Sequence, residues 1–143
     1  MRDRLSCRVV NARETARQIA IGRMGFGIAF MSAPGFFGRM WVGSDAARPA
    51  GKLLFRALGA RDLALGMGTL LSMRHDRPTR GWLEASGLAD FADFVATLLA
   101  GDAVAPVSRA VTLAIAGPSA ALCGLTAARV DLGREQVKHA DQA

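Results

Sequence analysis

The chain has few of the groups that carry common enzyme chemistry. Its 143 residues include only two cysteines, Cys7 and Cys123, which form no Cys-x-x-Cys pair and are expected to be reduced thiols. Two histidines, His75 and His139, stand in polar segments, so neither is expected to ligate a metal. The metalloprotease motif HExxH and the hydrolase motif GxSxG are absent. No metal and no cofactor is therefore expected.

Neither a nucleotide-binding loop nor a cleavable leader is expected. Gly25-Phe26-Gly27 and Gly66-Met67-Gly68 lack the third glycine and the preceding strand of a dinucleotide-binding turn. The first apolar segment follows a polar lead of 18 residues, contains Arg23 and has no A-x-A cleavage site. It is expected to be a retained first span.

Four long apolar blocks dominate the chain. Hydrophobic residues make up 51% of the sequence and charged residues 21%, which alone is ordinary for a soluble protein. Their distribution is not ordinary, because most charges fall between blocks of about 20 apolar residues. The expected fold is all-α, a four-helix transmembrane bundle at residues 19–129. The expected spans are 19–33, 52–74, 81–101 and 107–129, with a basic segment at 1–18 and a polar tail at 130–143.

The flanks of the first span carry two further predictions. Residues 1–18 are expected to form an amphipathic helix on an anionic leaflet or, as the alternative, a frayed basic tail. The span should stop at Pro34-Gly35. Phe36, Phe37, Met40 and Trp41 are then expected to be interfacial anchors, and the alternative is an aromatic loop that grips a substrate.

The basic residues predict an orientation. The net charge is +6, but the arginines bracket apolar blocks instead of forming a basic face, so nucleic acid is not an expected partner. Eleven fall on the side of the two termini: five within residues 1–18, then Arg74, Arg77, Arg80, Arg129, Arg134 and Lys138. Four fall on the other side: Arg39, Arg48, Lys52 and Arg109. By the positive-inside rule the chain is expected to be a multi-pass protein of the inner (cytoplasmic) membrane with both termini cytoplasmic.

Stripes of small residues are expected where helices touch. They are Gly22 and Gly25 in the first span, Gly59, Asp62, Gly66 and Thr69 in the second, and Ala116, Ala120, Gly124 and Ala128 in the fourth.

Charged side chains are expected to meet halfway across the membrane. The predicted buried network has three arginines and three aspartates, a neutral balance: Arg23, Arg56, Arg61, Asp62, Asp90 and Asp93. In one interpretation these groups form closed ion pairs that fix helix register. In the other, Asp90 and Asp93 share a helix face and split into an ionised carboxylate beside arginine and a protonated partner, an arrangement suited to acid–base chemistry or a proton relay. Candidate catalytic residues are Asp90, Asp93, Arg61 and Asp62.

The most specific stretch is Leu58-Gly59-Ala60-Arg61-Asp62-Leu63-Ala64-Leu65-Gly66, together with Asp90 and Asp93. Over residues 18–130 the chain resembles a family of small bacterial four-span proteins of unknown function, loosely similar to the DoxX-like group. The resemblance implies a four-helix integral membrane bundle and marks Arg61, Asp62, Asp90 and Asp93 as family positions. DoxX-like proteins are associated with membrane redox systems, but this chain lacks paired cysteines for a thiol-redox role.

The expected function is that of a membrane subunit or scaffold with a buried Arg/Asp network. The alternative is a membrane enzyme or proton-coupled carrier that uses the paired aspartates, and a soluble helical bundle is a third possibility. The expected partners are the lipid bilayer and another membrane protein or a second copy of the chain.

Overall fold

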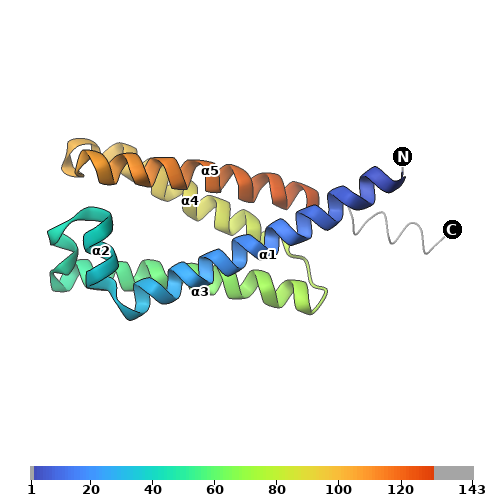
Figure 1. The fold of residues 1–143 in the computed structure, drawn as a ribbon, viewed down its shortest axis with the longest axis horizontal. Helices are drawn as coiled ribbons and strands as arrows, with labels where there is room; N and C mark the ends of the chain where they lie inside the picture. The colour runs from blue at the N-terminus through green and yellow to red at the C-terminus, as the bar shows by residue number, and fades with distance from the viewer. Residues whose placement is uncertain (1, 131–143) are drawn as a thin grey trace.

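The computed structural model describes residues 2–130, which form helices joined by short turns (Figure 1). The elements are α1 (Arg2–Ser32), α2 (Pro34–Val42), the 3₁₀ turn η1 (Ser44–Ala47), α3 (Pro49–Arg74), α4 (Arg80–Ala100), the 3₁₀ turn η2 (Gly101–Ala103) and α5 (Pro106–Val130). These residues contain no strand, so the prediction of an all-α fold is confirmed. The predictions made for residues 131–143 and for the side chain of Cys7 lie outside the described part.

Three of the four predicted spans match observed helices to within three residues, namely α3, α4 and α5. Pro49 and Pro106 open two of them, in the first turn where a missing N–H is harmless. The first span differs, because α1 begins at Arg2 and includes the basic N-terminal segment. Val130, expected in the polar tail, is the buried last residue of α5.

The segment after Pro34 is a helix, α2, and not the aromatic loop that was the alternative interpretation. Pro34 ends α1 and starts α2, and the chain bends by 108° between them. Phe36 and Met40 are exposed, as interfacial anchors would be. Trp41 instead donates its indole N–H to the Thr112 hydroxyl of α5, 2.8 Å away, so it belongs to the bundle interior.

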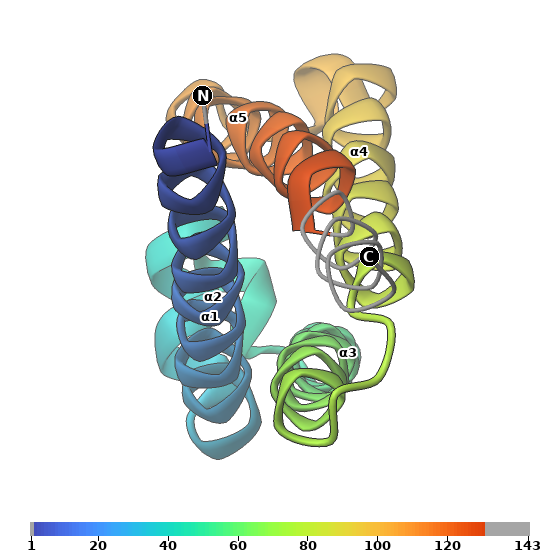
Figure 2. The same cartoon turned by 90° about the vertical axis from the view of Figure 1, so that its right-hand side faces the viewer.

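Helices α1 and α3 form a close antiparallel pair, and α4 and α5 form another (Figures 1 and 2). The α1–α3 contact depends on glycine. A Cβ on Gly59 would lie 2.8 Å from the carbonyl oxygen of Gly27, and one on Gly66 would lie 2.6 Å from that of Ala20. All four members of the predicted α3 stripe are buried. Gly22 was expected to make such a contact and does not, since no atom lies within 4 Å of its Cβ position; the same holds for Gly25.

The predicted small-residue ladder of α5 is only partly correct. Ala116 is buried, but Gly124 and Ala128 are exposed, and Cys123 and Ala127 take their place at the contact. The reason is geometric, since a four-residue repeat drifts about 40° around a helix at each step. A Cβ on Gly87 of α4 would meet Cys123 Cβ at 3.2 Å, which shows how closely α4 and α5 approach.

The interior is built from small residues and the surface carries the large apolar ones. At the end where α1 begins, the core consists of Ala12, Ala16, Leu83, Ala127 and Val130. Twenty large hydrophobic side chains are exposed, with Leu99 at 81% and Val107 at 75% among the most exposed. This distribution reverses the usual arrangement of a water-soluble bundle.

Among the described helices, α5 alone is long and apolar enough to cross a membrane. Only 22% of its apolar window is buried inside the bundle, unlike the core helix of a soluble protein. Helices α1 and α2 meet the same condition together, as one strongly bent pair. The sequences of α3 and α4 are interrupted midway by Arg61-Asp62 and by Asp90 and Asp93. The structure therefore shows an all-α bundle with one or two helices of membrane-spanning character.

Candidate functional site

Arg23 of α1 lies at the centre of a group of charged residues from three helices. Its guanidinium is 2.5 Å from Asp62 Oδ1 of α3 through Nη1 and 2.5 Å from Asp90 Oδ2 of α4 through Nη2. Nη2 also donates to the backbone carbonyl of Ser86, 3.0 Å away. The three charged side chains are between 7% and 12% exposed. We call Arg23, Asp62 and Asp90 the buried triad.

A second ion pair lies beside the triad and is more open. Arg61 of α3 binds Asp93 of α4 through two parallel hydrogen bonds of 3.0 and 2.8 Å. Their side chains are 32% and 36% exposed. Arg61 Nη2 also lies 3.6 Å from Asp62 Oδ1, which links this pair to the triad. We call Arg61 and Asp93 the outer pair, and the five residues together the charged cluster.

Asp90 and Asp93 share a face of α4, as their spacing predicted, but they bind different arginines. Asp90 also accepts a hydrogen bond from the Ser119 hydroxyl of α5, so all four long helices contribute to the network. Ser119 was missed at the sequence level. The signal that could have found it is a hydroxyl midway along an otherwise apolar helix.

Arg56 does not belong to the cluster. Its side chain is exposed, and it forms none of the ion pairs observed among residues 11–130. Arg56 and Asp62 are six positions apart in the sequence, which places them about 120° apart around the helix. The expected balance of three arginines and three aspartates is therefore wrong. With all five groups ionised, two arginines and three aspartates give the cluster a formal charge of −1.

A cavity of about 490 Å³ opens onto the cluster. Its volume is in the range of small-molecule sites. All five members of the cluster line it, and further walls come from α2 and α5. The aromatic part of the lining consists of Phe26, Trp41 and Phe55.

The central cavity is open at the side of the bundle, where α1 and α2 face α4 and α5. Its exposed lining residues are Gln18 and Gly22 on α1, Val42 on α2, Ala96 on α4 and Ile115 on α5. Figure 1 shows α1 crossing close to α5 near the start of α1 and diverging from it towards α2. The dry core of small residues closes the bundle at the crossing end. A molecule in the cavity would therefore enter from the side of the bundle.

Two guanidinium donors facing the site have no partner. The Nε–H groups of Arg23 and Arg61 are buried and make no hydrogen bond within the described residues. A buried N–H without an acceptor is unfavourable by about 1–3 kcal/mol. Both residues line the central cavity, so an occupant with acceptor atoms would satisfy them.

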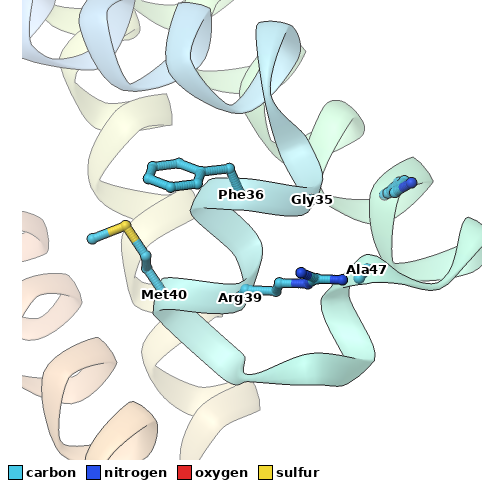
Figure 3. Close-up of a pocket in the computed structure, with 6 residues that line it drawn as sticks. Gly35, Phe36, Arg39, Met40 and Ala47 are labelled. Atoms are coloured by element: carbon cyan, nitrogen blue, oxygen red, sulfur yellow. The ribbon is translucent and has the colours of Figure 1, made fainter.

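A shallower hollow of about 500 Å³ lies at the opposite end from the start of α1 (Figure 3). Phe36 and Met40 extend from one side of α2, while Arg39 reaches towards Ala47. Lys52 completes the rim, so the hollow is basic as well as apolar. This combination matches the interfacial anchoring predicted for the segment.

The remaining sequence predictions concern metals and thiols. Within residues 2–130 no set of three His, Cys, Asp or Glu side chains is arranged to hold a metal ion. Cys123 is a free, fully buried thiol at the α4–α5 contact. His75 is exposed at the end of α3.

Comparison with protein-family models, curated proteins and solved structures finds no match to this chain. The resemblance to DoxX-like proteins stays a prediction. The function has to be argued from the cluster and its cavity.

Proposed function

We propose that the chain is a four-span protein of the inner membrane, with both termini cytoplasmic, and that its central cavity binds a small molecule. Lipid as the surrounding solvent accounts for the reversed distribution of side chains. Lipid tails are as apolar as leucine, so large side chains can face outward, while small and polar groups meet between helices. Exposed Leu53, Leu54, Leu88, Phe91 and Leu99 on α3 and α4 fit this environment.

The observed ends of the bundle support the orientation. α1 begins, α3 passes to α4 and α5 ends at one end (Figure 1). Arg13 and Asp76 lie 3.6 Å apart there. Within residues 2–130 this end carries nine basic residues, five of them in residues 2–18 together with Arg74, Arg77, Arg80 and Arg129, and the opposite end carries four. The positive-inside rule then puts the arginine-rich end in the cytoplasm.

The observation that carries the binding function is the opening of the central cavity onto all five members of the charged cluster. In a purely structural ion network the charged groups pair with one another and need no contact with solvent or a ligand. Here the outer pair is about one third exposed and faces a cavity large enough for a drug-sized molecule. Intramembrane ionisable groups of this kind mark substrate or ion pathways.

Membrane placement is tested by alkaline carbonate extraction of cell membranes. We expect the protein to stay in the pellet, as spanning proteins do. Release of the intact protein into the supernatant would leave the soluble helical bundle as the correct interpretation.

The cavity is tested with two matched glycines on α1. Gly22 lines the cavity opening and Gly25 does not, and a Cβ at either position meets no atom within 4 Å. We expect Gly22→Leu to weaken binding of a cavity-sized probe by about tenfold or more, and Gly25→Leu to leave it unchanged. Tetraphenylphosphonium and tetraphenylborate, which have the same shape and opposite charge, serve as probes in equilibrium dialysis of the detergent-purified protein. If Gly22→Leu alters neither, the cavity is not the binding site.

A membrane subunit or scaffold is the second candidate function. The observation in its favour is the open space around Gly25 on α1 and Gly124 on α5, which would let a partner helix approach closely. In that case Gly25→Leu should disrupt a complex or oligomer resolved by chemical crosslinking in membranes. The binding function predicts no change in that experiment.

A further inference from the structure

We infer that the ligand of the central cavity is a monovalent organic cation with an apolar body, and that it enters in exchange for one proton. This inference rests on the proposed function, since it names the chemical class that the cavity binds.

Charge balance is the first argument. The charged groups facing the cavity are Arg23 from α1, Arg61 and Asp62 from α3, and Asp90 and Asp93 from α4. The cavity lining from α2 and α5 includes no charged side chain. The ionised cluster therefore has one negative charge in excess, and an unbalanced charge is unfavourable in an apolar interior. One proton or one monovalent cation restores neutrality, and each excludes the other.

The exposed fractions of the three carboxylates indicate which of them the cation contacts. The carboxylates of Asp62 and Asp90 are 7% and 12% exposed and are held by Arg23. Asp93 is 36% exposed and is the most accessible carboxylate of the cluster. An ionised carboxylate has about four acceptor sites, so Asp93 can bind a second cation while it remains paired with Arg61. The cation is therefore assigned to Asp93, and the displaced proton belongs to the cluster as a whole.

The aromatic wall is the second argument. Phe26, Trp41 and Phe55 line the same cavity, and ring faces attract organic cations. The wall is held in place: the centroids of Phe26 and Trp41 are 5.7 Å apart in an edge-on contact, and Trp41 is anchored to Thr112. A bare metal ion or a proton alone would make no use of these rings. An apolar body also fits entry from the lipid-facing opening at the side of the bundle.

The two unpartnered arginine donors do not reverse this assignment. Arg23 Nε–H and Arg61 Nε–H can donate to a carbonyl or ether oxygen on the same molecule. An anion would satisfy them too, but it would raise the excess negative charge from one to two. The charge of the cluster therefore determines the class of ligand, and hydrogen bonds to the two arginines can determine which members of that class bind best.

The test measures the charge preference and the proton count of the full chain in detergent. We expect tetraphenylphosphonium to bind about tenfold or more tightly than tetraphenylborate, with release of about one proton per bound cation in weakly buffered solution. Cation affinity should rise with pH by up to about tenfold per unit until the cluster is fully ionised. Equal affinity for the two probes, tighter binding of tetraphenylborate, or no proton release would overturn the inference.

Charge variants give a result that a merely structural role would not. Asp93→Asn removes the excess charge and should weaken cation binding by about tenfold to a hundredfold. Arg61→Gln increases the excess charge and should strengthen the cation preference. Asp102→Asn, a fully exposed carboxylate outside the cavity, is the matched control. If Asp93→Asn and Arg61→Gln both weaken cation binding, the charge-balance argument is wrong.

The experiments distinguish failure of the cation proposal from failure of the proposed binding function. Loss of probe binding in Gly22→Leu with no charge preference keeps the cavity as a binding site and rejects the cation. If no probe binding depends on Gly22, both the cavity as a binding site and the cation as its ligand are rejected. Where a charge variant does not purify as a folded protein, the probe preference and the proton count of the wild type still decide the question.

Discussion

The buried triad and the outer pair have the same chemistry and different surroundings. Both join an arginine to aspartate across helices, but the Arg23 side chain is 9% exposed and that of Arg61 is 32% exposed. Arg23 binds two carboxylates and a backbone carbonyl, whereas Arg61 binds one carboxylate closely and lies 3.6 Å from a second. The triad ties three helices together, and the outer pair links two at the cavity wall.

Because of this difference, each of the two interpretations of the network applies to a different part of it. A closed set of ion pairs that fixes helix packing describes the triad, because removal of one member would leave a buried charge without a partner. A ligand-binding site describes the outer pair, because its side chains are about one third exposed and line the cavity. Stability and binding should therefore respond to different residues of one cluster.

The largest effect is expected for Arg23→Gln. The variant leaves Asp62 and Asp90 buried without their arginine, which should lower the free energy of unfolding by about 3–5 kcal/mol. Unfolding in detergent, followed by helical circular dichroism, measures the change. Arg17→Gln, an exposed arginine on the same helix, is the control. Equal stability of the two variants would show that the triad does not hold the bundle together.

Asp90→Asn should have a smaller effect than Arg23→Gln. It removes the charged acceptor of Arg23 and Ser119, but Arg23 keeps Asp62 and the Ser86 carbonyl. Loss of a hydrogen bond to a charged group suggests a destabilisation of about 1.5–3 kcal/mol. The same unfolding experiment checks it, and a loss as large as that of Arg23→Gln would place Asp90 instead of Arg23 at the centre of the network.

Ser119→Ala tests how much α5 contributes to the network around Asp90. It removes one donor to the Asp90 carboxylate and should lower the free energy of unfolding by about 1 kcal/mol. The exposed Ser44→Ala serves as its control. No difference between the two would mean that α5 is held only by packing.

The smallest effect on stability is expected for Asp93→Asn. The outer pair is partly exposed, and such ion pairs contribute about 1 kcal/mol or less. Tetraphenylphosphonium binding, measured on the same preparation, should nevertheless weaken by about tenfold to a hundredfold. A destabilisation matching that of Asp90→Asn would erase the distinction between the two groups.

The helices were predictable and their pairing was not. Pro49 and Pro106 open α3 and α5, because proline is favoured in a first turn, and Gly101 follows the end of α4. α2 was missed because Pro34-Gly35 was interpreted as the end of helical structure, although proline is also favoured in a first turn. Trp41 was consequently assigned to the membrane interface and not to the cavity wall.

The site was predictable in part. Sequence position gives the level of a charged residue along the bundle, and it placed Arg23, Arg61, Asp62, Asp90 and Asp93 at a common depth. Rotation about the helix decides which residues turn inward, and neglect of it led to the inclusion of Arg56. The choice of partner for each arginine, and the cavity, depend on how helices far apart in sequence pack together.

The most direct test compares Asp90→Asn with Asp93→Asn in one experiment. The two residues are one helical turn apart on the same face of α4, so they differ mainly in what surrounds them. Each variant is unfolded in detergent and titrated with tetraphenylphosphonium. We predict that Asp90→Asn loses stability, whereas Asp93→Asn keeps the stability of the wild type to within about 1 kcal/mol and binds the cation about tenfold to a hundredfold more weakly. Equal losses of stability in the two variants, or an unchanged cation affinity in Asp93→Asn, would contradict the division of the cluster.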